Sequence, residues 1–221
     1  MSVAGAVRRP SPNFGPRRGG AEPSLVVLHY TAMTSAEAAL DWLCAPQSQV
    51  SAHYLIGRDG RIWQMVDERD RAWHAGAGRW RDIDDVNSAS IGIEIDNPGD
   101  VPFSEPSMAM LERALADILV RWGIAPAGVI GHSDLAPGRK IDPGVRFDWR
   151  RLARRGLSVW PVAAAGGARD LEGALAEAGY TAPVPAEVRL AAFRARFRPC
   201  ASGPVEDADL ELLASLGSMC E

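Results

Sequence analysis

The chain has 221 residues and a formal net charge of −4, and 47% of its residues are hydrophobic. This length allows one domain of ordinary size plus a small second one, with enough apolar side chains for a core. The acidic balance argues against a nucleic-acid surface, which usually needs a basic stripe. No segment has the ~18 apolar residues of a membrane span. The three cysteines form no C-x-x-C pair and no disulfide framework, which is typical of a reducing compartment.

Residues 1–22 are rich in proline, glycine and arginine, and we expect an extended N-terminal arm. They lack the apolar core of about 7–15 residues that marks a signal peptide. The expected location is therefore the cytoplasm, or the periplasm if the natural N-terminus carries an export signal. We interpret the basic cluster of the arm as a solvated tail; its members are Arg8, Arg9, Arg17 and Arg18.

The next segments predict a strand followed by a helix. SLVVLH (24–29) is a short apolar run, typical of a buried strand. Thr34 and Glu37 make a capping-box pattern, which predicts the start of the helix SAEAALDWLC (35–44).

Two further strand patterns follow. AHYLIG (52–57) and RIWQMV (61–66) flank an Asp-Gly pair, which is a strong hairpin signal. SIGIEID (90–96) alternates, so that its three isoleucines lie on one face and Glu94 lies on the other. If that second face lines a pocket, Glu94 is a candidate general base; the alternative is a solvated acidic face.

The remaining elements complete a mixed domain. A helix is predicted from Pro106 to Trp122, where Gly123 ends it. GVIGH (128–132) is another short strand, and DWRRLARRG (148–156) is a closing helix. We therefore expect an α/β domain over residues 23–157, with a mixed central β-sheet flanked by helices.

The composition changes after this domain. Residues 158–168 are a linker by composition, and residues 169–221 contain three short amphipathic helix patterns. We expect a small three-helix C-terminal domain that depends on docking for its stability. The helix patterns are RDLEGALAEAGY, PAEVRLAAFRARF and EDADLELLASLG.

Three residues distant in sequence are candidates for a metal site. His29 and His132 each end a predicted strand, and Asp142 follows in a proline-rich loop. Catalytic zinc typically takes three protein ligands and keeps a fourth position for water. Each residue alone is a weak signal, because a strand-end histidine is more often structural and D-P-G is more often a turn.

Lys140 is the only lysine in a chain rich in arginine, and it stands two residues before Asp142. If this segment is extended, both side chains point to the same side. An ammonium is a compact point donor that suits a single oxyanion, whereas a guanidinium prefers bidentate partners. The alternative for Lys140 is an ordinary surface lysine. A serine mechanism through Ser133 is not supported, because the chain has no G-x-S-x-G elbow.

Five ordered motifs resemble the zinc-dependent N-acetylmuramoyl-L-alanine amidases of the AmpD/AmiD type, which share a fold with peptidoglycan recognition proteins. The match covers about residues 11–150, and the motifs read LVVLHYTA, VSAHYLIGRDGRIWQMV, RAWHAG, SIGIEI and GHSDLAPGRKIDPG.

The resemblance implies hydrolysis of the amide between N-acetylmuramic acid, or its anhydro form, and L-alanine in peptidoglycan fragments. It implies one Zn²⁺ per chain, held by His29, His132 and Asp142, with Glu94 and Lys140 as catalytic residues. It also places Trp73 and His74 at the rim of the substrate groove.

The second half resembles a peptidoglycan-binding helical domain, although it lacks the threonine of the usual ending; a purely stabilising, docked role is the alternative. We expect a monomer. The alternative functions are a non-catalytic peptidoglycan-binding or recognition protein and a zinc hydrolase of another amide.

Overall fold

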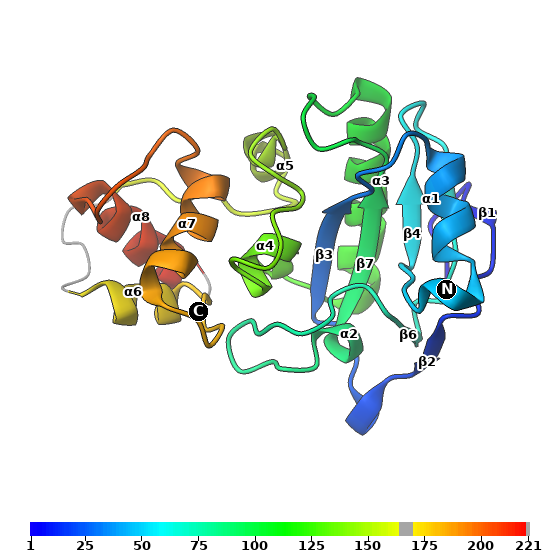
Figure 1. Cartoon of the computed structure of the whole chain (residues 1–221), viewed down its shortest axis with the longest axis horizontal. Helices are drawn as coiled ribbons and strands as arrows, with labels where there is room; N and C mark the ends of the chain where they lie inside the picture. The colour runs from blue at the N-terminus through cyan, green and yellow to red at the C-terminus, as the bar shows by residue number, and fades with distance from the viewer. Residues whose placement is uncertain (164–169, 220–221) are drawn as a thin grey trace.

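A six-stranded mixed sheet forms the centre of the computed structural model, which describes residues 1–163 and 170–219 (Figure 1). The strand order is β1-β5-β4-β7-β3-β8, and β5 is the strand that runs antiparallel to β4. The mixed α/β architecture predicted from the sequence is confirmed. The strands of this sheet are β1 (Val7–Arg8), β3 (Leu25–Tyr30), β4 (Tyr54–Ile56), β5 (Ile62–Gln64), β7 (Ser90–Ile95) and β8 (Val129–Gly131).

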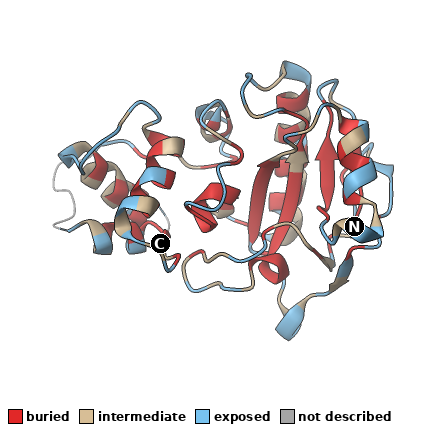
Figure 2. Cartoon of the chain, viewed as in Figure 1, coloured by how far each residue is buried: buried red, intermediate tan, exposed pale blue. Residues whose placement is uncertain are grey.

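The two faces of the sheet follow the alternation of the strands. The isoleucines of β7 pack on α3 (Glu105–Trp122), whereas Glu94 projects from the opposite face. On that opposite face, α1 (Ala36–Leu43) packs on Leu55 of β4. Figure 2 shows the central strands β3, β4 and β7 as largely buried and the outer sides of the helices as exposed.

The predicted start of α1 is wrong by one residue. The helix is capped by Ser35, whose hydroxyl accepts the Ala38 N–H at 3.2 Å, and not by Thr34. Both residues can cap, so the sequence pattern alone does not choose between them. The end of α3 is as predicted: Gly123 takes a left-handed conformation, which glycine adopts without steric cost.

The N-terminal arm is not a solvated tail, and this interpretation is corrected. β1 pairs with β5, and β2 (Phe14–Pro16) pairs with β6 (Asp70–Ala72). Arg17 is partly buried and donates to the backbone carbonyls of Ser88 and Ser90. Burial lowers the pKa of Arg17 to about 10. Arg17 thus fixes the arm to the sheet, because the carbonyls at the start of β7 need hydrogen-bond donors.

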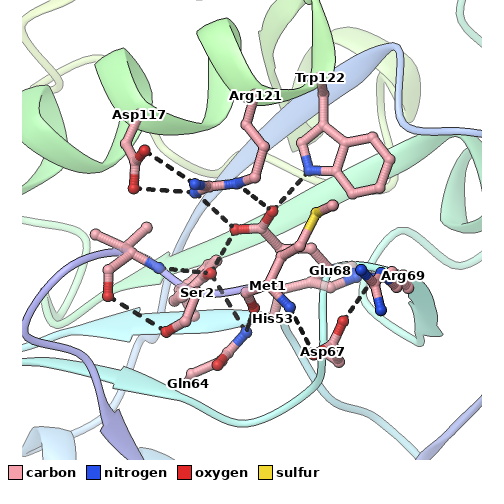
Figure 3. A network of polar contacts seen from close by, with 12 residues as sticks. Met1, Ser2, His53, Gln64, Asp67, Glu68, Arg69, Asp117, Arg121 and Trp122 are labelled. Atoms are coloured by element: carbon pink, nitrogen blue, oxygen red, sulfur yellow. Dashed lines mark hydrogen bonds and ion pairs between the residues drawn. The ribbon is translucent and has the colours of Figure 1, made fainter.

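A buried carboxylate ties the segment after β5 to α3 (Figure 3). Glu68 accepts from the Trp122 indole at 2.6 Å, from the Arg121 Nε at 2.9 Å and from the Tyr54 hydroxyl at 2.5 Å. The Val3 N–H in turn donates to the Tyr54 hydroxyl at 3.1 Å. Because every partner of this buried charge is in place, the network holds the N-terminal arm, β4 and α3 together.

The C-terminal helices lie beside α4 (His132–Leu135) and α5 (Trp149–Arg154), on the β8 side of the sheet (Figure 1). The three predicted C-terminal helices form, and part of the predicted linker, residues 164–168, lies outside the described residues. His132 begins a short helix instead of ending β8. The other helices are α2 (Val86–Ala89), α6 (Leu171–Glu177), α7 (Ala186–Phe197) and α8 (Asp207–Ser218), with short 3-10 turns at Arg18–Gly20, Pro46–Ser48 and Pro126–Gly128.

Within residues 1–163 and 170–219, no helix combines the length and the apolar character that crossing a bilayer requires.

Candidate active site

The candidate residues meet at the carboxyl ends of three parallel strands. In the register of β3 and β7, His29 lies directly beside Glu94. Leu28 of β3 pairs with Gly131 of β8, so the next residue, His132, follows at the level of His29. Parallel strands bring their carboxyl ends to one edge of a sheet, which explains why residues so distant in sequence converge here.

Three buried side chains place their donor atoms within hydrogen-bonding distance of one another. The Nδ1 atoms of His29 and His132 are 3.0 Å apart, and Asp142 Oδ2 lies 2.9 Å from the first and 3.0 Å from the second. Among the described residues, this is the group of histidine, cysteine and carboxylate side chains that could hold a metal ion. The convergence predicted from the sequence therefore occurs.

The electrostatics of the cluster favour a divalent cation. Burial lowers the pKa of His29 to about 4, so its imidazole is neutral at pH 7. Burial alone raises the pKa of Asp142, but hydrogen bonds with His132 and His29 hold it well below its usual range. Metal ions need neutral imidazoles and ionised carboxylates as ligands, and this cluster offers both.

Hydrogen bonds on the far side of each ring orient the two imidazoles. His132 Nε2 lies 2.8 Å from the Ala75 carbonyl oxygen, which can only accept, so its proton sits on Nε2. His29 Nε2 lies 3.1 Å from His74 Nδ1, and His74 Nε2 lies 3.2 Å from Ser90 Oγ. The Ser90 hydroxyl donates to the Val86 carbonyl, so it accepts from His74 Nε2. His74 Nδ1 in turn accepts from His29 Nε2. The Nδ1 atoms of His29 and His132, which face each other and Asp142, are then free to present lone pairs.

Gly92 makes room for this chain of rings. A Cβ built at residue 92 meets the His74 ring carbon Cγ at 2.5 Å, which is too close for any side chain. The glycine in the I-G-I-E pattern of β7 is therefore needed for the close approach of His74 to His29. The alternation of β7 indicated that Gly92 and Glu94 share a face, but nothing in the sequence placed His74 against that face.

Glu94 is a carboxyl group with a strongly perturbed environment. Its Oε2 atom is buried and has no hydrogen-bond partner among the described residues. Burial, followed by the negative charge of Asp142, raises its pKa well above 4.5, and Lys140 opposes this shift. A carboxyl with a buried oxygen and a raised pKa beside candidate metal ligands is typical of a general acid–base group.

The loop of residues 138–142 forms one wall of the site. Lys140 is exposed and lines the cleft together with Asp142. Its neighbour Arg139 donates to the carbonyls of Ala75 at 2.7 Å and of Ala77, which anchors the loop to the segment after Trp73. The sequence did not single out Arg139, because one arginine among many in the chain carries no positional signal.

The site opens into a cleft of about 510 Å³, large enough for part of a glycopeptide. Trp73 and His74 line it, as does Trp42 of α1, which is 48% exposed. The sequence patterns missed Trp42, because an exposed aromatic on a helix has no distinguishing spacing. Both ring nitrogens of His74 already have partners within the protein, so its contact with substrate stays a prediction.

The family model described as N-acetylmuramoyl-L-alanine amidase matches residues 19–145, the segment that carries this site. The chain is a member of this amidase family. Among curated relatives, the amidase AmiD of Escherichia coli is 35% identical over 224 residues, covering 86% of this chain and 80% of the relative. The 1,6-anhydro-N-acetylmuramyl-L-alanine amidase AmpD of Escherichia coli is also 35% identical, over 68% of this chain and 91% of the relative.

Solved structures agree with this assignment. The Escherichia coli amidase AmiD, in complex with anhydro-N-acetylmuramic acid-L-Ala-D-γ-Glu-L-Lys, aligns with a TM-score of 0.76 at 31% identity, over 92% of this amidase and 96% of that chain. AmpDh3 of Pseudomonas aeruginosa, in complex with anhydromuramic pentapeptide, aligns with a TM-score of 0.78 at 31% identity, over 91% and 93%. The predicted family, fold and enzyme class are thereby confirmed.

Proposed function

We propose that this amidase hydrolyses the bond between N-acetylmuramic acid, or its anhydro form, and L-alanine in peptidoglycan fragments. We further propose that it uses one zinc ion held by His29, His132 and Asp142. The observation that carries the proposal is the meeting of these three donor atoms with Glu94 at the head of the cleft. The related amidases with bound anhydro-muropeptides support the choice of substrate.

The donor set fits zinc. Two imidazole nitrogens and one carboxylate oxygen are ligands that Zn²⁺ accepts, and three protein ligands leave one position open. The ring orientations add support, because each histidine engages its remote nitrogen and presents Nδ1 to its partners. When bound, zinc supplies a Lewis acid that activates water and polarises a carbonyl group.

The side chains around the metal position have separate roles in the proposed mechanism. Glu94 takes the proton of the attacking water on its buried Oε2 and later delivers it to the leaving amine of L-alanine. Its raised pKa keeps this second transfer favourable near neutral pH. Lys140 directs its ammonium at the negative charge that develops on the carbonyl oxygen. Arg139 holds the loop that carries Lys140 and Asp142.

Digestion of soluble anhydro-muropeptides and of purified sacculi, followed by mass spectrometry, tests the proposed reaction. The expected products are the intact sugar and a free stem peptide with an N-terminal L-alanine. Dipicolinate should stop the reaction, and added zinc should restore it. Binding of the muropeptide without release of peptide would support the alternative, a recognition protein that does not cut. Cleavage of another amide alone would replace the proposed substrate.

Lys140→Arg is expected to lower kcat by about 10²-fold, while zinc content stays near one per chain. A single oxyanion donor typically contributes this much, and a planar guanidinium cannot take the place of a compact ammonium at one oxygen. Steady-state kinetics on an anhydro-muropeptide, with elemental analysis of the same sample, measure both quantities. Val120→Ala serves as the control, because Val120 is 85% exposed on α3 and does not line the cleft. Unchanged turnover in Lys140→Arg would remove Lys140 from the mechanism.

Three further expectations stay predictions: glycan binding by residues 169–221, a monomeric state and a cytoplasmic location. Co-sedimentation of a Glu94→Ala variant with sacculi tests the first. Light scattering after gel filtration tests the second, and cell fractionation tests the third.

A further inference from the structure

The C-terminal helices share a hydrophobic core with the amidase domain. Val27 of β3 and Ile130 of β8 belong to the same buried cluster as Leu175 of α6 and Phe193 of α7. Leu135 of α4 lies in this cluster as well. The helices are therefore packed directly behind the strand-to-helix turn that carries His132.

One buried carboxylate connects the two parts. Asp134 is fully buried and accepts from the Arg196 Nη1 at 2.6 Å and from the Tyr180 hydroxyl at 2.8 Å. It also accepts from the Gly131 N–H at 2.8 Å. The C-terminal segment thus supplies two of these three donors to the carboxylate, and the third comes from the residue before His132.

Arg196 is itself held firmly against the amidase domain. Its Nη2 donates to the Val129 carbonyl at 3.0 Å and to the Ser158 hydroxyl at 3.1 Å. Its guanidinium lies over the Trp149 ring, 3.8 Å from the centroid. Its side chain is only 4% exposed, so water cannot replace these partners of the guanidinium.

We infer that the C-terminal helices hold the metal ligand His132 in place through Asp134, with Arg196 and Tyr180 as positioning residues. Asp134 fixes the backbone before His132 through Gly131, and the Ser133 N–H fixes it afterwards by donating to the Asp142 carbonyl at 2.9 Å. This inference rests on the proposed metal centre.

The physical reason is the cost of an unpaired buried charge. Without Arg196, the carboxylate of Asp134 is left buried without a counter-charge, which is strongly unfavourable. The structure relaxes by moving Asp134 toward water, and this movement releases the Gly131 N–H and the turn. His132 Nδ1 then leaves its place beside Asp142, so the affinity for the metal falls.

Arg194 provides a matched control on the same helix. Arg194 and Asp209 form a second buried ion pair, with side chains 7% and 0% exposed, within the C-terminal helices. Loss of this pair weakens the helical part without touching Asp134. Arg194→Met and Arg196→Met therefore separate a general loss of stability from a specific effect on His132.

Zinc affinity by chelator competition and the visible spectrum of the Co²⁺-loaded protein test the inference. Arg196→Met is expected to weaken zinc binding by about tenfold or more and to alter the Co²⁺ bands. Tyr180→Phe is expected to have a smaller effect of the same kind, and Arg196→Lys to recover part of the affinity. Arg194→Met should keep the wild-type affinity and spectrum despite a lower melting temperature.

Wild-type affinity and spectrum in Arg196→Met would overturn the inference, as would equal losses in Arg194→Met and Arg196→Met. If Arg196→Met does not fold, Tyr180→Phe decides: wild-type zinc binding in that variant counts against the inference, and weaker binding with a changed spectrum supports it. Absence of zinc binding by the wild-type protein would instead contradict the proposed function.

Discussion

Asp142→Ala is expected to reduce zinc content from one ion per chain to nearly none and to abolish amidase activity. The substitution removes the one anionic donor of the cluster and leaves two neutral imidazoles, whose Nδ1 atoms are 3.0 Å apart. Two neutral ligands do not hold zinc against a chelator at neutral pH. Elemental analysis after gel filtration measures the loss.

Asp100→Ala is the control for this experiment, because Asp100 is an exposed carboxylate away from the cluster. It should keep both zinc and activity. Added zinc should also raise the melting temperature of the wild-type protein and of Asp100→Ala but not that of Asp142→Ala, since a ligand stabilises only the state that binds it. Full zinc occupancy in Asp142→Ala would show that the ligand set is wrong.

Glu94→Gln is expected to lower kcat by about 10³-fold while zinc binding is retained. The amide is close in size to the carboxyl group but can neither take up nor return a proton. The same substitution should stabilise the metal-free protein at neutral pH. None of the residues that the structure describes forms a hydrogen bond with the buried Oε2 of Glu94, and burial raises its pKa well above 4.5, so ionising it in the folded state is costly.

The size of this stability change depends on pH. Between the unfolded pKa of 4.5 and the raised folded pKa, the folded protein binds the Glu94 proton more tightly, so its stability falls as the pH rises. The amide of the variant does not titrate. The difference in melting temperature between Glu94→Gln and the wild type should therefore be small near pH 4 and grow toward pH 8.

Thermal unfolding of chelator-treated protein across this pH range measures the difference. Glu22→Gln, which changes an exposed carboxylate, should show no such trend. A difference that stays flat with pH would mean that burial does not destabilise the charged form of Glu94. A fully active Glu94→Gln variant would refute its role as the base.

The local elements could be predicted because their signals are short in range. The alternation in SIGIEID places Glu94 opposite the isoleucines, and the helical spacing after Pro106 predicts α3. The Asp59-Gly60 pair joins two strands that do form a hairpin. Each pattern depends on neighbours within one turn or one strand, so each can be read without knowledge of the fold.

The sequence predicted which residues form the candidate site but not which residues hold them in place. His29, His132 and Asp142 stand out as strand-end and loop residues, and their motifs resemble those of the amidase family. Arg17 and Arg196, by contrast, have no local pattern that separates them from other arginines of the chain. Their partners lie as far as 73 and 67 residues away in sequence, at Ser90 and Val129.

The sequence by itself determined which side chains could bind a metal, which face of β7 carries the candidate base Glu94, and where the elements begin and end to within a few residues. Only the tertiary structure decided that the N-terminal arm is part of the sheet and that His74 contacts the Nε2 atom of His29. It also decided that Arg196 forms an ion pair with Asp134, two residues after His132. Propensity and periodicity act between near neighbours, whereas buried charges and unpaired carbonyls find their partners only once distant segments are packed together.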